Sequence, residues 1–140
     1  MTTRTDQERT IVVGVDGSPG SRRALRWAVE HSEHRDAITP VMTYLPGPFG
    51  DGFGTNAGVD PTHHPYGDEA LTRLREFVGE FEPALVDRCV VSEHRAGPGL
   101  VEAAQAADLL VVGTRGRSLR VDLSLGSVGS YCIKHSSVPV

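Results

Sequence analysis

TIVVGVDGSPGSRRALRWAVE, residues 10–30, decides the fold class of this chain. It begins with a nearly continuous apolar run that ends at Asp16. A run of this kind, without polar alternation, is typical of a strand buried on both faces of a parallel sheet. Ser18 and Pro19 then fit a helix N-cap and a first helical position, and apolar residues follow at helical spacing. The stretch therefore predicts a strand, a turn and an amphipathic helix that ends near residues 32–35.

The alternation of strands and helices continues along the chain. We expect strands at 38–44, 86–94 and 108–112, helices at 67–82, 98–106 and 127–135, and the start of a fifth strand at 136–140. This order predicts a three-layer α/β fold with a doubly wound, mostly parallel, Rossmann-like sheet of five strands, the last one truncated. The first and fourth strands are expected at the centre and the third near an edge. Pro40 predicts that the second strand starts late or lies at an edge.

Composition limits the classes of partner. The chain has 140 residues and a formal net charge of −4, which fits one domain spanning residues 1–140. This balance gives no overall attraction to nucleic acid or to an anionic membrane. No apolar run approaches the roughly 18 residues of a membrane span, and the polar N-terminus lacks the apolar core of a signal peptide. We therefore expect a cytoplasmic protein with neither nucleic acid nor membrane as a partner.

Several features give no sign of catalysis. Residues 46–67 are rich in Gly, Pro and Asp and predict a long, flexible loop. His63 and His64 are adjacent in it, but no second cluster of ligands has the spacing of a metal site. Cys89 and Cys132 lack metal-binding or redox spacing, so we interpret them as small core or surface thiols. No nucleophile–base pair stands out, and we assign no catalytic and no metal-ligating residue.

The segment after the fourth predicted strand, GTRGRSLRVDLSLGS at 113–127, has the parts of a phosphate site. In doubly wound sheets ligands bind beyond the carboxyl ends of the strands, where the strand order reverses. Gly113 lets the strand turn without a Cβ atom, and Gly116 lets the backbone approach a ligand. Gly126 and Ser127 open a helix, with Ser127 as its cap, and free N–H groups at a helix start favour an anion. The alternative is a surface loop with ordinary caps.

Two common nucleotide fingerprints are excluded. The segment has no GKS or GKT as in a Walker A loop, and GVDGSPGS at 14–21 has no third glycine in the register of GxGxxG. Asp16, inside this turn, is a second candidate site residue. Its carboxylate could accept hydrogen bonds from ribose hydroxyls or help to hold a metal, or it could cap the backbone of residues 18–21. Both interpretations stay open.

At these residues the chain resembles the universal stress protein family, over nearly its whole length. The resemblance rests on VVGVDGS, SRRALRWA, LVEAAQAADLLVVGTRGR and the closing GSVGSYCIKHSSVPV. The ATP-binding branch of that family carries the pattern G-2x-G-9x-G-(S/T), which the chain matches at Gly113, Gly116, Gly126 and Ser127. The resemblance implies an adenine nucleotide alpha hydrolase-like fold.

The resemblance also implies a ligand and its site. The implied ATP-binding residues are Gly14, Asp16, Thr43, Val112, Gly113, Arg115, Gly116, Gly126, Ser127 and Val128. Asp16 would contact the nucleoside and Thr43 would line the adenine pocket. The ligand would be ATP or another adenine nucleotide, with Mg²⁺ beside a triphosphate, and the protein would be a homodimer paired through its fifth strand. Gly129 and Asp122 depart from the family pattern, because the first lacks a hydroxyl and the second adds an acid to the loop.

These features support one function over two others. The first is an ATP-binding stress-response regulator whose partners, still unidentified, change with nucleotide occupancy. Its turnover would be slow at most, since we see no residue placed to activate water, although the resemblance leaves weak ATP hydrolysis or autophosphorylation open. The second is an interaction module of the same fold that binds no nucleotide. The third, an enzyme that adenylylates a substrate, lacks the SGGxDS-like loop expected after the first strand.

Overall fold

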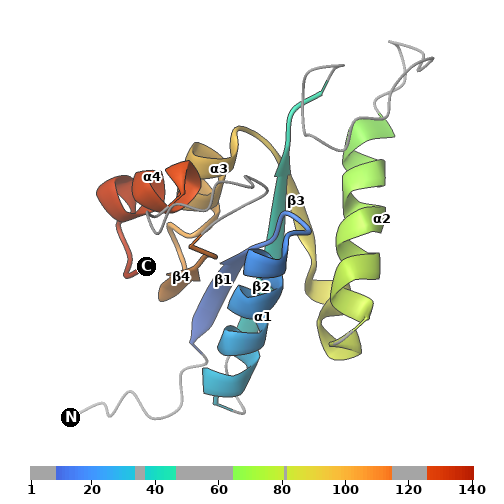
Figure 1. Cartoon of the computed structure of the whole chain (residues 1–140), viewed down its shortest axis with the longest axis horizontal. Helices are drawn as coiled ribbons and strands as arrows, with labels where there is room; N and C mark the ends of the chain where they lie inside the picture. The colour runs from blue at the N-terminus through green and yellow to red at the C-terminus, as the bar shows by residue number, and fades with distance from the viewer. Residues whose placement is uncertain (1–8, 34–36, 47–64, 81, 115–125) are drawn as a thin grey trace.

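One parallel sheet organises the chain (Figure 1). The computed structural model describes residues 9–33, 37–46, 65–80, 82–114 and 126–140. Within them lie the strands β1 (Thr10–Gly14), β2 (Ala37–Tyr44), β3 (Val90–Glu93) and β4 (Leu109–Val111), in the order β3-β2-β1-β4. All three pairings are parallel. The strand order reverses between β1 and β4, as the sequence predicted, and β3 lies at an edge of the described sheet.

Helices cover both faces of the sheet (Figure 1). They are α1 (Pro19–His31), α2 (Pro65–Gly79), α3 (Ala96–Ala103) and α4 (Ser127–His135), with a short 3₁₀ helix η2 (Pro83–Arg88) before β3. The first two helices pack on one face and the last two on the other. The prediction of a three-layer, doubly wound α/β fold is therefore confirmed.

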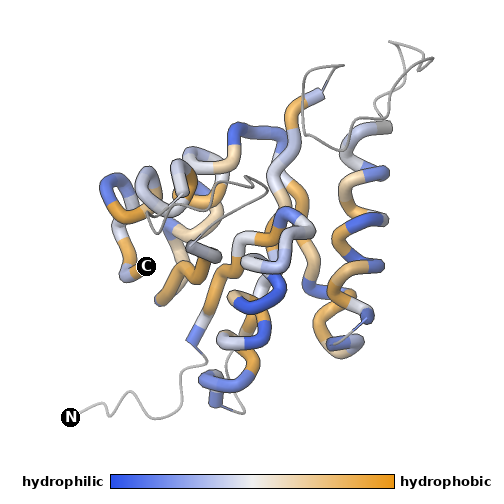
Figure 2. The backbone as a smooth tube through the Cα atoms, viewed as in Figure 1, coloured by the Kyte–Doolittle hydropathy of each residue, from blue (hydrophilic) through white to orange (hydrophobic). Residues whose placement is uncertain are grey.

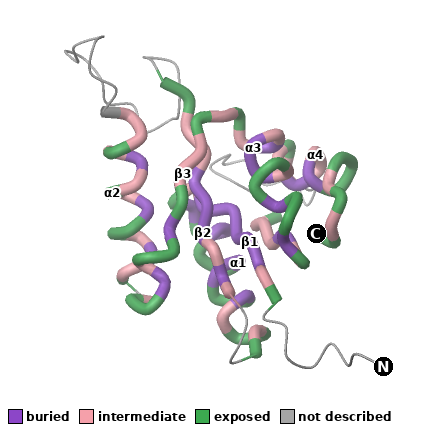
Figure 3. Tube along the Cα trace, turned by 180° about the vertical axis from the view of Figure 1, so that it is seen from behind, coloured by how far each residue is buried: buried purple, intermediate pink, exposed green. Residues whose placement is uncertain are grey.

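The strand β1 explains why the opening sequence is apolar without alternation. Ile11 and Val13 belong to the core beneath α1 and α2, whereas Val12 belongs to the core beneath α3 and α4. Successive side chains of a strand point to opposite faces, so a strand covered on both faces needs apolar residues throughout. Figure 2 shows the tube in hydrophobic orange along most of β1 and along β4, and alternating between blue and orange along α2. Figure 3 shows the resulting burial along β1 and β2.

The predicted fifth strand is corrected by the structure. The described residues form a four-stranded sheet, and residues 136–140 are not assigned as a strand. They nevertheless lie beside β4, because the N–H of Leu110 donates to the carbonyl oxygen of Pro139 at 2.9 Å. Pro139 has no N–H of its own, so it cannot complete the ladder of bonds that defines a strand pair.

The expectation that Pro40 puts the second strand at an edge, or delays its start, is wrong. β2 begins at Ala37 and lies between β1 and β3. The carbonyl of Val41 faces β1, where it accepts from the N–H of Val15 at 2.8 Å. Pro40 therefore turns its nitrogen toward the β3 side, and the pairing with β3 starts only at Val41. The missing donor of Pro40 falls where no neighbouring strand requires it.

Other boundaries shift by a few residues. The predicted third strand at 86–94 shortens to β3, because Pro83 starts the 3₁₀ helix η2 in its place. Of the predicted loop at 46–67, residues 47–64 lie outside the described residues, as do His63 and His64, and residues 65–67 already belong to α2. Within the described part of the chain, no helix is long and apolar enough to cross a membrane.

Candidate functional site

Three of the predicted site residues share one face of the sheet at its carboxyl edge. A Cβ atom added to Gly14 would lie 2.7 Å from Cδ1 of Leu100 and 3.3 Å from Cγ1 of Val112. Thr43, at the end of the neighbouring strand β2, has its Cγ2 atom 2.7 Å from the Cβ position of Gly99. These contacts place Gly14, Thr43 and Val112 on the side covered by α3. A larger residue at Gly14 would also require the tip of the Leu100 side chain to move.

Gly113 joins the end of β4 to the start of α1. A Cβ atom at Gly113 would lie 2.8 Å from both the carbonyl carbon and the carbonyl oxygen of Gly20. These are backbone atoms, which cannot move aside as the tip of a side chain can. Gly113 therefore needs to be glycine for the fold, whether or not a ligand binds. Sequence reasoning missed Gly20, although a glycine in the first turn of a helix is a signal of close approach.

At the start of α1, nearby side chains accept backbone N–H groups. Oδ1 of Asp16 accepts from the N–H of Ser18 at 2.9 Å, and Oγ of Ser18 accepts from the N–H of Ser21 at 3.2 Å. The hydroxyl of Ser21 donates to the carbonyl of Ser18 at 2.9 Å. Gly17 makes the turn with a φ of 82°, a conformation that favours glycine. Asp16 thus caps the N–H of Ser18, as one of its two interpretations predicts, and its contact with a nucleotide stays a prediction.

The start of α4 is built differently. Its N-cap is Gly126, which has no side chain to accept from the helix, so the prediction of Ser127 as the cap is wrong by one residue. The N–H of Gly126 donates to the carbonyl of Thr114 at 2.7 Å, and the N–H of Ser130 makes the first helical bond, to Gly126, at 3.0 Å. The N–H groups of Ser127, Val128 and Gly129 precede that bond and belong to the orphan donors of a helix start.

The hydrogen bond between Thr114 and Gly126 brings β4 and α4 together at the carboxyl edge. Sequence reasoning missed Thr114, which is exposed at the end of β4. Ser127 is exposed, whereas Val128 packs against the core beneath α3 and α4. Arg115, Gly116 and the acidic residue of the loop, at position 122, lie outside the described residues.

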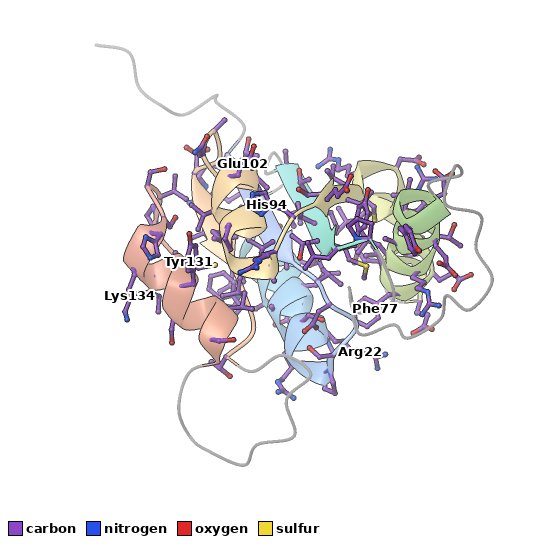
Figure 4. The ribbon with its side chains drawn as sticks, turned by 90° about the horizontal axis from the view of Figure 1, so that it is seen from above. Arg22, Phe77, His94, Glu102, Tyr131 and Lys134 are labelled. Atoms are coloured by element: carbon purple, nitrogen blue, oxygen red, sulfur yellow. The ribbon has the colours of Figure 1, made fainter. Side chains whose placement is uncertain are left out.

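Outside the candidate site, two buried thiols have raised pKa values and one histidine lies close to a carboxylate. Burial raises the pKa of the Cys89 thiol to about 11 and also raises that of Cys132, so both stay protonated near neutral pH, as expected of core thiols. His94 lies 3.6 Å from the carboxylate of Glu102 along α3, and both are labelled in Figure 4. In the part of the chain that the structure describes, no group of three or more His, Cys, Asp or Glu side chains could hold a metal ion.

Comparison with known sequences agrees with the family resemblance described above. A sequence profile of the universal stress protein family matches residues 8–140. The chain is 33% identical over 138 residues to universal stress protein Rv2623 of Mycobacterium tuberculosis, a match that covers 93% of this chain and 46% of that protein. It is 30% identical over 134 residues to universal stress protein Mb2019 of Mycobacterium bovis, with coverages of 93% and 42%. The chain thus spans about half the length of the curated relatives it matches.

Comparison with solved structures finds universal stress proteins of similar fold. A universal stress protein crystallised in complex with cAMP has a TM-score of 0.60 and 26% identity, and the match covers 94% of this chain and 93% of that one. The protein UspA from Lactobacillus plantarum has a TM-score of 0.71 and 19% identity, with 96% of both chains covered. The second likeness concerns the fold alone.

Proposed function

Because the chain belongs to the universal stress protein family, we propose that it binds ATP and acts as a nucleotide-dependent regulator in a stress response. The nucleotide would lie across the carboxyl edge of the sheet, with its phosphates at the start of α4. The ten residues implied by the family pattern, from Gly14 to Val128, are the proposed site. ATP is a cytoplasmic ligand, so the proposal includes a cytoplasmic location.

One observation carries the proposal, namely the difference between the two helix starts at this edge. At α1, the carboxylate of Asp16 and the hydroxyl of Ser18 already accept backbone N–H groups. At α4, the cap is a glycine, and the adjacent Ser127 is exposed. Backbone N–H groups and the helix dipole together favour an anion at such a position. The reversal of strand order beside it is where doubly wound sheets bind their ligands.

The family supports the class of ligand. The cAMP complex of a 26% identical universal stress protein is a case in which an adenine nucleotide binds a protein of this fold. The glycine spacing from Gly113 to Gly126 points to a triphosphate in this chain. Mg²⁺ would then enter with the phosphates. We assign no catalytic residue, and any hydrolysis would be slow because no described group is placed to activate water.

A second function is an interaction module that binds no nucleotide. It is favoured by the packing of Gly14 against Leu100 and of Gly113 against Gly20. Gly113 is needed by the fold and Gly14 packs closely on its neighbours, so the presence of these glycines is not by itself evidence of a ligand. Gly126 differs, because its φ of −63° and ψ of 166° suit any residue.

The proposal includes a homodimer. Its support is membership of the family, and the surface concerned is the outer edge of β4, where the N–H of Leu110 donates to the carbonyl oxygen of Pro139. Light scattering coupled to gel filtration would give the mass in solution. A monomer at high concentration would contradict this part alone and leave the nucleotide site untouched.

Isothermal calorimetry with ATP, with and without Mg²⁺, tests the proposed site. We expect the native protein to bind ATP. Gly126→Val should bind it at least about tenfold more weakly, because the carbon atoms of the valine side chain would occupy the space proposed for a phosphate group. Ser18→Ala is the matched control, since it alters the other helix start. Titration with cAMP in the same buffer tells whether the triphosphate is preferred. Native protein that binds neither ligand at hundreds of micromolar would favour the interaction module.

A further inference from the structure

Trp27, the single tryptophan of the chain, lies on the outer face of α1 with 45% of its surface exposed. The opposite side of this helix packs on the sheet, where Ala24, Leu25 and Ala28 are buried. The core therefore does not need the indole ring at this position. Tryptophan is enriched among the residues that carry most of the binding energy of protein–protein interfaces.

The next turn of the helix holds the indole ring in place. The imidazole ring of His31 stacks on that of Trp27, with the ring centroids 4.4 Å apart and the planes inclined by 17°. Nδ1 of His31 lies 2.8 Å from the carbonyl oxygen of Trp27, and because a carbonyl oxygen only accepts, this nitrogen donates. Both residues are exposed. A ring that is ordered before binding loses less freedom on binding, so this stacked pair is a preorganised apolar surface.

Arginine side chains surround this ring pair on the exposed side of α1. Arg23 lies one helical turn before Trp27, where side chains are neighbours on a helix surface, and Arg26 directly precedes Trp27. Both arginines are exposed. Among the residues that the structure describes, none forms a hydrogen bond or an ion pair with Arg23 or Arg26. Their guanidinium groups are thus available to a partner.

Arg22, the remaining arginine of α1, has a different role. Its guanidinium group lies 3.5 Å from the carboxylate of Glu80 and 5.5 Å from the ring centroid of Phe77. Figure 4 labels Arg22 and Phe77 side by side, where α1 meets α2. These contacts turn Arg22 toward α2, so it belongs to the packing between the two helices and not to the surface around Trp27.

The charges of this surface select the kind of partner. α1 has one acidic residue, Glu30, against its arginines. A second copy of the chain that docked through the same surface would bring arginine against arginine, because a two-fold contact pairs a patch with itself. Nucleic acids gain affinity from many phosphate contacts, which two arginines on a chain of net charge −4 do not provide. Carboxylates match the planar guanidinium group, and an aliphatic side chain matches the indole ring.

We propose that the exposed surface of α1 formed by Arg23, Arg26, Trp27 and His31 binds an acidic segment of another protein. An aliphatic side chain of that segment lies on the indole ring, and its carboxylates pair with the two arginines. Trp27 is about 12 Å along the helix axis from the start of α1, so this surface is separate from the proposed phosphate position. The proposal does not rest on nucleotide binding.

Tryptophan fluorescence tests the proposal directly, because Trp27 is the sole source of the signal. The probes are the acidic peptide DELLEDLLED, the basic peptide KKLLKKLLKK and a single-stranded oligouridylate, each titrated into the full chain without nucleotide. We expect the acidic peptide to bind with a dissociation constant below about 1 mM. It should shift the emission to shorter wavelengths, because the indole ring loses contact with water. The other two probes should leave the emission unchanged.

Fluorescence anisotropy of the fluorescein-labelled acidic peptide compares variants with their controls. Trp27→Ala should weaken binding at least about tenfold and Arg23→Glu about tenfold, through the loss of the apolar contact and the reversal of one charge. Ile133→Ala and Arg88→Glu are the matched controls, because Ile133 is 59% exposed on α4 and Arg88 is exposed at the end of η2. Both should bind within about twofold of the native protein.

Five outcomes would overturn the proposal. The native emission could stay unchanged at millimolar acidic peptide, or the basic peptide could bind as tightly as the acidic one. Binding of oligouridylate alone would mean a surface for nucleic acid. Self-association of the native chain that Trp27→Ala abolishes, measured by sedimentation, would mean that a second copy covers this surface. Equal losses for Arg88→Glu and Arg23→Glu would mean that only the overall charge matters. In each case the proposed nucleotide site is unaffected.

Discussion

The starts of α1 and α4 lie at the same edge of the sheet, yet their backbone N–H groups have different partners. At α1, Asp16 accepts from the N–H of Ser18, and Ser18 accepts from the N–H of Ser21. At α4, the cap is Gly126, which has no side chain. The contact between Gly20 and Gly113 holds the start of α1 against the end of β4. The difference teaches that side chains cap the start of α1, whereas a residue without a side chain begins α4, where we propose that the phosphates bind.

The largest effect is expected where α1 meets the end of β4. Gly113→Ala places a methyl group 2.8 Å from the backbone of Gly20. We expect it to lower the free energy of unfolding by about 2–3 kcal/mol, the upper range for overpacking a tight contact. Urea denaturation measures this loss. Gly126→Ala is the comparison, and it should cost no more than about 1 kcal/mol, because alanine is a poorer N-cap than glycine but meets no strained backbone.

Removal of the exposed hydroxyl at the α4 start should affect binding and not folding. Ser127→Ala deletes a hydroxyl that could donate to a phosphate oxygen, and hydrogen bonds to charged groups are the stronger ones. We expect an approximately tenfold loss of ATP affinity, about 1.4 kcal/mol, with little change in stability. Paired calorimetric and urea titrations measure both quantities. A stability loss without an affinity loss would mean that α4 behaves like α1.

At the start of α1 we expect the opposite result, a loss of stability with little change in ATP affinity. Ser18→Ala removes the oxygen that accepts from Ser21, and loss of an N-cap costs about 1 kcal/mol of stability. ATP affinity should stay within about twofold, because this start makes no proposed phosphate contact. The same two titrations measure the result. A tenfold affinity loss here would show that the phosphates lie at α1.

The smallest effect is expected for a change that keeps the cap of α1. Asp16→Asn retains an oxygen that can accept from Ser18, so stability should change by less than about 0.5 kcal/mol. The neutral amide accepts more weakly from a ribose hydroxyl, and we expect ATP affinity to fall about threefold. A competition titration resolves this difference. An unchanged affinity would leave Asp16 as a capping residue alone.

Much of the fold could be predicted because it follows from local patterns. The apolar run of β1, the SP pair that begins α1 and the helical spacing after it each determine one element. Pro40 was misjudged because its effect depends on which neighbour its nitrogen faces, and that is known only once the strands are paired. The extent of the last strand was misjudged for a similar reason, since Pro139 contributes a carbonyl but no N–H.

The sequence singled out the glycines of the candidate site, but it did not give the contacts that these glycines make. Spacing alone singled out Gly113 and Gly126 without telling that the first is held against Gly20 by backbone contact. Asp16 had two interpretations, and only the turn geometry could show that it caps the backbone. Such close approaches join segments far apart in the sequence, so no local pattern contains them.

The most direct test of the difference between the two helix starts is an NMR titration of the ¹⁵N-labelled protein with ATP. The backbone amide resonances of Ser127, Val128 and Gly129 should shift most, because their N–H groups would donate to phosphate oxygens. Those of Gly20 and Ser21 should shift little. Shifts concentrated at the start of α1, or none at either start at saturating ATP, would contradict the account.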